Sequence, residues 1–328
     1  MHVVGMGNAL MDVLLRLPSD AVLERIGLRK GVMELVSEAQ MLALREEQAS
    51  LIQTEKPGGA ACNTVRALSR LGVKTGFIGK IGTDAAGIYY EEAVRNAGVT
   101  PFFVRTEGIS GSCTVLISPD GERTMATFLG PAAEIRPAEL SDTLFPDDGY
   151  LYIEGYLTAN EPLMRAAIAL ARRKGTKVAL DLANFHIVDT YKPLLEEIVP
   201  QVDILFCNES EAKAFTRMSA GAAAECLGRL VRIAVVTMGE NGALIASGGN
   251  VFHVEAHRCC PIDTTGAGDH FAAGFFYGQT AKATLEQSGR LGVLLAGYAV
   301  NVIGTEIPEE YWEKIRNEMA EILGTGKR

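Results

Sequence analysis

A glycine-rich segment near the C-terminal end carries the clearest chemical pattern in the sequence. Residues 263–269 read D-T-T-G-A-G-D, and a helical pattern begins where the segment ends. Glycine lets the backbone turn tightly and approach a ligand, and successive amides at a helix N-terminus form a site for anions. Asp269, at the mouth of such a nest, can accept the proton of an attacking hydroxyl. Taken alone, the segment would equally suit a helix N-terminus with a capping aspartate.

Four further motifs precede this segment. They are P-G-G-A-A-C-N at 57–63, G-K-I-G-T-D-A-A-G at 79–87, N-E-S-E at 208–211 and T-M-G-E-N-G at 237–242. In this order, the five motifs resemble those of the ribokinase or PfkB carbohydrate kinase family across nearly the whole chain. The resemblance implies an ATP-dependent kinase with an α/β fold, in which a three-layer, doubly wound, mostly parallel sheet carries a small β-sheet lid.

The resemblance gives the catalytic and cation-binding roles to the last motif. Asp269 is expected to be the general base. The anion hole is expected to consist of three backbone amides, those of Gly266, Ala267 and Gly268. Asp263 and Thr265 are expected to help hold K⁺, with the loop 299–304 completing that site.

The resemblance also implies which residues face the nucleotide. Asn208 and Glu211 are expected to act on Mg²⁺ and the phosphates through water, because Mg²⁺ prefers oxygen ligands and keeps several waters. A helix cap by Asn208 would explain that pair without any ligand. The other expected contacts to phosphates, ribose or adenine are Thr237, Gly239, Arg123 and Asn301. Arg123 resembles an arginine of the adenosine-kinase branch, and a surface position on the lid is an equally good interpretation.

Residues of the N-terminal half are expected to bind the acceptor. Asp12 follows the first strand and offers a carboxylate to hydroxyl groups, while Gly59 lets the backbone approach and Asn63 offers both a donor and an acceptor. Glu154, at the end of an expected strand, is a further candidate. A solvated carboxylate at a strand end is the alternative for Glu154.

Strands and helices alternate most clearly from Gly149 onward. The expected strands are Tyr150–Ile153, Val178–Leu182, Ile204–Cys207, Ile233–Thr237 and Gly242–Ala246. The expected helices are Glu161–Lys174, Lys192–Val199, Gly268–Gln279, Thr284–Val302 and Glu309–Leu323. This β-α-β alternation predicts a parallel sheet with helices on both faces.

Two stretches interrupt the alternation. Val13–Leu17 and Gly31–Val36 look like strands, and Ser112–Ser118 and Arg123–Phe128 flank a Pro-Asp-Gly turn typical of a hairpin. We expect one α/β kinase domain over residues 1–328, with a discontinuous β lid from about 13–57 and 100–130. The apolar lid strands could pair two copies into a homodimer.

Composition excludes several classes of function. The net charge of −9 and the lack of a basic stripe argue against nucleic-acid binding. The sequence contains no run of about 20 apolar residues, so we expect no membrane span. The six cysteines form no C-x-x-C pair, which argues against a zinc ribbon or a thioredoxin site. Such dispersed cysteines, with no signal peptide, indicate a reduced, cytoplasmic protein.

The acceptor is the least determined part of the prediction. The opening G-N-A-L-M-D at 7–12 resembles the adenosine-kinase branch, yet residues 13–57 contain no aromatic side chain to stack on a base. The sequence therefore favours a sugar kinase first and an adenosine or other nucleoside kinase second. In the second case, Phe102, Phe103 and Phe128 would supply the stacking. A catalytically silent binding protein on the same fold is disfavoured by the intact Asp269 motif.

Overall fold

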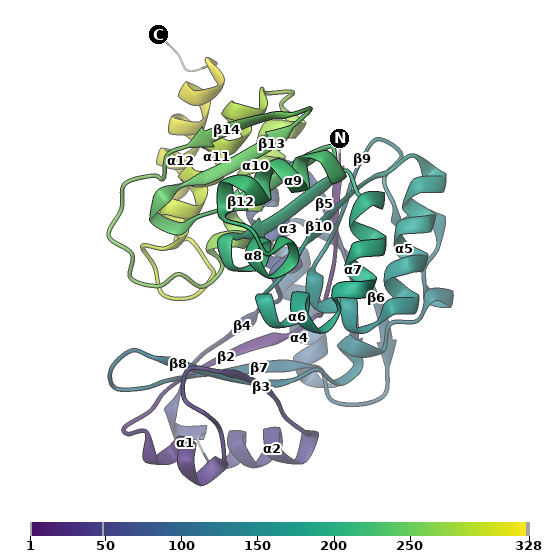
Figure 1. Cartoon of the computed structure of the whole chain (residues 1–328). Coiled ribbons are helices and arrows are strands. Elements are labelled where there is room, and N and C mark those ends of the chain that lie inside the picture. The colour runs from purple at the N-terminus through teal and green to yellow at the C-terminus, as the bar shows by residue number, and fades with distance from the viewer. Residues whose placement is uncertain (1, 48, 326–328) are drawn as a thin grey trace.

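A nine-stranded sheet forms the body of the molecule in the computed structural model, which describes residues 2–47 and 49–325 (Figure 1). Its strand order is β14-β13-β12-β11-β10-β9-β1-β5-β6, and β13 runs in the direction opposite to the other eight strands. The strands are β1 (His2–Met6), β5 (Lys74–Gly82), β6 (Val99–Thr106), β9 (Gly149–Ile153), β10 (Lys177–Asp181), β11 (Ile204–Asn208), β12 (Ile233–Thr237), β13 (Ala243–Ser247) and β14 (Asn250–Val254).

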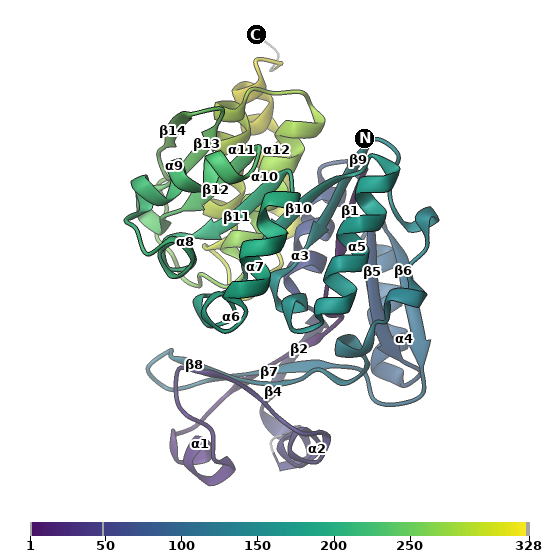
Figure 2. The same ribbon diagram turned by 45° about the vertical axis from the view of Figure 1, so that its right-hand side comes forward.

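Both faces of this sheet are buried by helices (Figure 2). In β9, Tyr150 and Tyr152 join one apolar core, while Leu151 and Ile153 join the other, because successive side chains of a strand point to opposite faces. The first core includes α3 (Ala60–Arg70), α4 (Ala85–Asn96), α10 (Ala267–Thr280), α11 (Leu285–Ala299) and α12 (Glu309–Leu323). The second includes α5 (Glu161–Lys174), α6 (Phe185–Thr190), α7 (Lys192–Ile198), α8 (Glu209–Thr216) and α9 (Ala220–Leu230). The predicted three-layer, doubly wound fold is confirmed.

A second sheet of five strands forms the lid. Its order is β3-β8-β7-β2-β4, from β2 (Met11–Arg16), β3 (Met33–Leu35), β4 (Ile52–Pro57), β7 (Ser112–Ile117) and β8 (Arg123–Phe128). Two helices that we did not predict, α1 (Ala21–Ile26) and α2 (Glu38–Glu47), lie on the side of the lid away from the main sheet (Figure 1). They close a small separate core with Leu15 and Leu116.

The predicted lid boundary at residue 100 is wrong. Residues 99–106 form β6, which pairs in parallel with β5 along its whole length and so belongs to the main sheet. The second lid segment begins only at Ser112. Phe103 consequently packs inside the main domain, with its ring centroid 5.8 Å from that of Phe77 and 5.7 Å from that of Tyr90.

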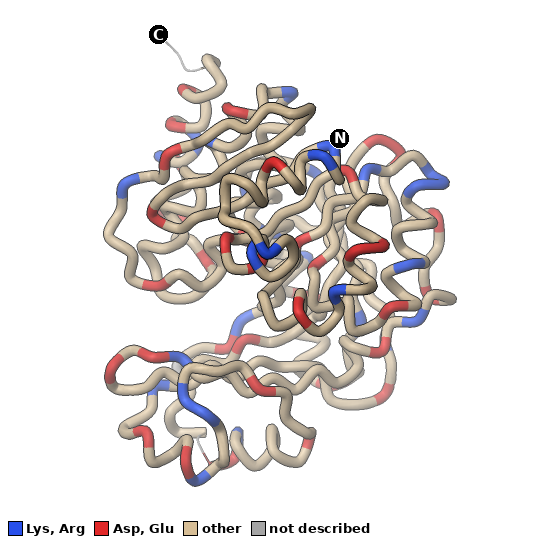
Figure 3. The backbone as a smooth tube through the Cα atoms, viewed as in Figure 1, with Lys and Arg blue, Asp and Glu red and all other residues tan. Residues whose placement is uncertain are grey.

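In the view of Figure 3, acidic and basic residues are interspersed over both the main body and the lid. Within the described ranges, no helix is both long and apolar enough to cross a membrane.

Candidate active site

A cavity of about 460 Å³ lies between the lid and the carboxyl ends of the main parallel strands. Glu154, Asp181, Asn208 and Thr237 line it, each at the end of a strand or directly after it. Ligands bind at this edge of open α/β sheets, because the loops and helix N-termini that follow the strands converge there. Twelve predicted site residues line this cavity: Asp12, Gly59, Asn63, Glu154, Asn208, Glu211, Thr237, Thr265, Gly266, Ala267, Gly268 and Asp269.

The glycine loop, which was predicted to supply three amides to an anion hole, lies at the start of α10. Gly266 has a left-handed conformation (φ 74°), and a Cβ there would lie 2.9 Å from the Thr305 side chain, so the position requires glycine. The amide of Ala267 lies 3.2 Å from the carbonyl oxygen of Thr264. Among the described residues, the amides of Gly266 and Gly268 have no hydrogen-bond partner, and these two are free to bind an anion.

Asp269 sits in the first turn of α10 with a basic carboxylate. The side-chain amide of Asn63 donates a hydrogen bond of 2.9 Å to its Oδ2. Burial raises the pKa of Asp269 to about 8, the hydrogen bond from Asn63 opposes the rise, and three other carboxylates around the cavity add to it. The result is a carboxylate with the proton affinity that a general base needs near neutral pH.

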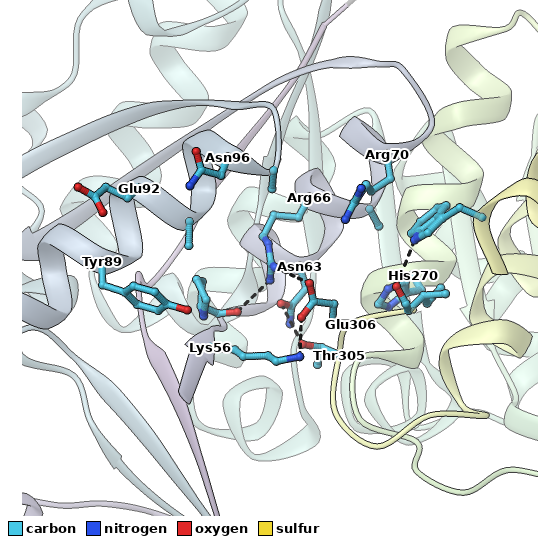
Figure 4. A pocket seen from close by; sticks show the side chains of 16 residues that line it. Lys56, Asn63, Arg66, Arg70, Tyr89, Glu92, Asn96, His270, Thr305 and Glu306 are labelled. Atoms are coloured by element: carbon cyan, nitrogen blue, oxygen red, sulfur yellow. Dashed lines mark hydrogen bonds and ion pairs between the residues drawn. The ribbon is translucent and has the colours of Figure 1, made fainter. Parts of the chain in front are cut away.

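Asn63 also borders a second cavity of about 350 Å³, where a neighbouring side chain fixes its amide (Figure 4). Thr305 donates to its Oδ1 over 3.3 Å. The next residue, Glu306, accepts from Lys56 over 2.6 Å and lies 3.6 Å from the guanidinium of Arg66. Asn63 is therefore fixed between Thr305 and the Asp269 carboxylate, while its predicted contact with the acceptor remains a prediction.

Asp12 offers the cavity a carboxylate of its own. Burial raises its pKa to about 7, and the positive charge of Arg66 opposes that rise. No hydrogen bond to another described side chain stabilises its charge, so its oxygens can accept hydroxyl protons from a ligand. Gly59 lies beside it with φ 92°, where a Cβ would come within 2.4 Å of the Asn8 carbonyl oxygen.

Glu154 is not the solvated carboxylate that we considered, because it is 1% exposed. Its two oxygens accept from the amides of Asn8 (2.7 Å) and Ala61 (3.1 Å), which ties the end of β1 to the start of α3. Burial raises its pKa to about 7. Glu154 therefore supports the floor of the cavity, and direct contact with the acceptor remains a prediction.

Asn208 and Glu211 form a helix cap and also line the cavity. Asn208 Oδ1 accepts from the amide of Glu211 over 2.9 Å, and Glu211 Oε2 accepts from the amide of Asn208 over 2.8 Å, which is a capping box. Burial, followed by the charge of nearby Asp181, raises the pKa of Glu211. Asp181 is a site residue that we missed, although its place at the end of an expected strand was a usable signal.

These two carboxylates suit a magnesium ion. Asp181 and Glu211 offer carboxylate oxygens whose pKa values burial raises, so a bound cation would relieve an unfavourable state. The described ranges hold no group of three His, Cys, Asp or Glu side chains able to bind a metal alone. Mg²⁺ fits such a site because it takes one or two carboxylates and completes its shell with water and phosphate oxygens.

A neighbouring cavity of about 690 Å³ shares Thr237, Ala267 and Gly268 with the first. Gly239 lines it, whereas Asn301 does not, and the contacts of both residues with the nucleotide remain predictions. The side-chain amide of Asn301 turns back to donate to the Gly297 carbonyl oxygen over 2.9 Å, at the end of α11.

Arg123 reaches the site from the lid, but it contacts the residues predicted to hold K⁺. Its guanidinium donates to Thr265 Oγ1 and pairs with Asp263 Oδ2, each at 2.5 Å. K⁺ does not fit these side chains as they stand, because its expected oxygen ligands already bind a positive charge. A contact between Arg123 and nucleotide phosphates remains a prediction.

The phenylalanines expected to stack on a base are elsewhere. Phe102 and Phe103 lie on β6, and neither they nor Phe128 line the acceptor cavity. Four other aromatic side chains line it, one on strand β11 and three on loops or helices that follow main strands. They are Tyr156, Tyr191, Phe206 and Phe271.

Comparisons with known proteins agree with this geometry. The sequence model described as pfkB family carbohydrate kinase matches residues 39–312. The chain is 26% identical to adenosine kinase of Schizophyllum commune over 95% of this chain and 97% of that protein. It is 30% identical to the solved structures of a probable sugar kinase from Rhizobium etli (TM-score 0.87, 98% of both chains) and of adenosine kinase from Sinorhizobium meliloti (TM-score 0.86, 96% of this chain and 98% of that one).

Proposed function

The chain belongs to the pfkB family of carbohydrate kinases and is a phosphotransferase, and we propose that its acceptor is the hydroxyl of a nucleoside. Members of the family use ATP, usually with Mg²⁺. The proposal concerns the acceptor and the part that each residue plays in the transfer.

In the proposed reaction, Asp12 accepts a hydrogen bond from the nucleoside and Asp269 takes the proton of the reacting hydroxyl. The hydroxyl oxygen bonds to the terminal phosphorus of ATP, and the bond from that phosphorus to the leaving ADP oxygen breaks. The amides of Gly266 and Gly268 stabilise charge on the transferring group, a contribution worth about 10²–10³-fold for one donor.

The nucleotide is proposed to lie along the cavity that Thr237 and Gly239 line. Glu211, acting through water, and Asp181 are proposed to hold Mg²⁺, which neutralises phosphate charge when bound. Asn63 keeps the Asp269 carboxylate turned toward the acceptor.

The apolar lid wall carries the proposal of a nucleoside. Our reason for favouring a sugar was the lack of aromatic side chains in the first lid segment, but Tyr156 and Tyr191 supply rings from the main domain. Beside Asp12 on the same face of the lid sheet, the wall offers almost no other hydrogen-bonding side chains, and it consists of Leu10, Met33, Leu35, Cys113, Met125 and Leu129 with Thr127. A nucleoside would place its ribose on the polar floor and its base under this wall, whereas a free sugar would leave hydroxyls facing apolar groups.

A sugar remains the second candidate. Asp12 and the polar groups of the cavity floor would bind a free polyol as well as a ribose, and one similar solved structure is called a probable sugar kinase. A catalytically silent binding protein is disfavoured, because Asp269 has both the raised pKa and the orienting partner of a working base.

An acceptor screen tests the proposal. Formation of ADP would be measured with Mg²⁺ and ATP, using adenosine, inosine and guanosine against ribose and fructose, with Asp269→Asn as the control for background ATP hydrolysis. We expect a nucleoside to exceed every sugar in kcat/KM by at least tenfold, which is about 1.4 kcal/mol of discrimination. A sugar that wins by that margin would replace the nucleoside.

We also propose the homodimer predicted from the lid. The outer lid strands β3 and β4 each have a free edge within the described sheet, and Leu42 on α2 is 45% exposed. Light scattering would measure the mass in solution, and a mass of one chain at all concentrations would reject the dimer.

A further inference from the structure

Arg123 links the lid to the anion loop. It begins β8, directly after the hairpin turn, and pairs with Ile117 across the lid sheet. Its side chain is 23% exposed, and its guanidinium binds Thr265 Oγ1 and Asp263 Oδ2. A side chain from the lid thus reaches the loop that carries the base.

The carboxylate of Asp263 binds both Arg123 and two backbone amides at this contact. The side chain of Asp263 is 3% exposed, so its charge must be compensated by protein groups. Its Oδ1 accepts from the amide of Thr265 over 2.9 Å, and its Oδ2 accepts from the amide of Gly304 over 2.6 Å. Arg123 supplies the only formal positive charge that pairs with Asp263 in the described ranges.

We propose that the guanidinium of Arg123 is the built-in monovalent cation of this site, so that the kinase works without K⁺. Guanidinium carries one positive charge at all relevant pH values, as K⁺ does, and its N–H groups hold Asp263 and Thr265 in fixed directions. A K⁺ ion beside these oxygens would meet a like charge within a few ångströms, which is strongly unfavourable in a buried site. The inference rests on the proposed phosphotransfer, in which the anion loop must be held rigid.

A cation carried by the lid also couples lid position to the anion loop. Lys30 bonds Asp20 and Asp120 over 2.6 Å each, which ties the hairpin turn to the body of the lid, so Arg123 moves with the lid as a unit. The anion loop therefore receives its stabilising charge only when the lid covers the acceptor. A free ion would bind the loop whether the lid was open or closed.

Cation dependence tests the proposal in wild type, Arg123→Ala and Arg123→Lys. Arg29→Ala is the control, because Arg29 is a lid arginine that is 77% exposed and pairs, among the described side chains, only with Glu34. Melting temperature and turnover would be measured in KCl and in choline chloride at equal ionic strength. Wild type and Arg29→Ala should respond equally to the two salts.

For Arg123→Ala, turnover in choline chloride should fall by about tenfold or more, and KCl should restore a substantial part of that loss. Its melting temperature should rise in KCl alone, by about 2 °C, because K⁺ then binds the vacated oxygens. Arg123→Lys should keep more activity than Arg123→Ala and respond less to KCl.

Two results would overturn the proposal. One is wild type that K⁺ activates or stabilises more than choline does. The other is an Arg123→Ala protein, or an Arg123→Lys protein if the first does not fold, that loses activity without any response to K⁺. The melting measurements need no substrate, so they remain decisive even if the proposed acceptor is wrong.

Discussion

Carboxyl groups around the cavity and a carboxyl beside β5 lie in opposite electrostatic surroundings. Burial raises the pKa of Asp12 and Glu154 to about 7 and of Asp269 to about 8. Glu139 is also shielded from water, but hydrogen bonds from Arg136 and from the buried Lys80 lower its pKa to about 2. The carboxylate of Glu139 is paired with cationic side chains, whereas the carboxylates around the cavity have no such partners among the described residues.

The difference separates carboxylates that stabilise the fold from carboxylates that destabilise it but are available to a ligand. A paired carboxylate such as Glu139 holds two segments together, whereas an unpaired one favours any ligand that brings a proton or a cation. The cavity is suited to a hydroxyl proton at Asp269 and to Mg²⁺ at Glu211 and Asp181. Removing a charge should therefore have opposite effects on stability in the two regions.

The largest effect is expected from Asp269→Asn. Turnover should fall by about 10²–10⁴-fold, because the amide keeps the shape of the side chain but cannot accept the proton. The melting temperature should not fall, because an unpaired charge has been removed. Glu286→Gln, which neutralises an exposed first-turn carboxylate of α11, is the matched control and should change neither quantity. Near-normal turnover of Asp269→Asn would remove Asp269 from the role of base.

For Lys80→Met we expect the opposite outcome, which is a loss of stability with unchanged activity. This change leaves Glu139 without its buried partner, so the free energy of unfolding should fall by about 3 kcal/mol. Activity per folded molecule should stay the same, since Lys80 lies outside the cavity. Lys74→Met, at the exposed start of the same strand, should be nearly neutral in chemical denaturation. Equal stabilities of the two variants would contradict the contrast.

A smaller effect is expected at the magnesium site. Glu211→Gln keeps the capping box, because glutamine can replace glutamate in that motif, but it removes the charge. The Mg²⁺ concentration for half-maximal activity should rise by about tenfold or more, as for other residues that support a metal. Titration of Mg²⁺ at fixed ATP measures it, and an unchanged midpoint would mean that Glu211 is only a helix cap.

The smallest effect that we expect is a change in the free energy of unfolding with pH. Asp12, Glu154 and Asp269 have ordinary pKa values of 3.8 to 4.5 when unfolded and bind protons more tightly when folded. Between about pH 5 and 8 the folded chain holds more protons, so the free energy of unfolding falls as pH rises. The ligand-free melting temperature should drop by a few degrees from pH 6 to pH 8, and less so in Asp269→Asn. A melting temperature that rises over this window would refute the raised pKa values.

Much of the fold was predictable because local signals agreed with it. Glu161–Lys174 was predicted to the residue, since Gly175 ends it in a left-handed conformation (φ 78°). The N-terminal half was less predictable, because lid strands and main strands alternate along the chain and look alike. Residues 99–106 were assigned to the wrong sheet for that reason, and no local pattern distinguished the two.

Site residues likewise fall into those that the sequence predicted and those that it did not. The glycine loop and Asp269 were predictable because one continuous motif carries them. Asp181 was missed although the end of an expected strand marked it, whereas Thr305 was missed because only the folded chain brings it to the cavity. Arg123 was predicted as a phosphate contact or a surface residue, and its pairing with Asp263 joins segments 140 residues apart (263 − 123) that no spacing rule connects.

The pH dependence of kcat/KM tests most directly whether Asp269 is the base in this poorly compensated site. The rate would be measured from about pH 5.5 to pH 9.5 in wild type and Asn63→Ala, since kcat/KM reports the pKa of the free enzyme. We predict a rise with pH in wild type that has its midpoint near pH 8 and levels off about one pH unit higher. The midpoint should lie higher in Asn63→Ala, which loses the hydrogen bond that lowers the pKa. A wild-type rate already level at pH 5.5, or the same midpoint in both proteins, would contradict the account.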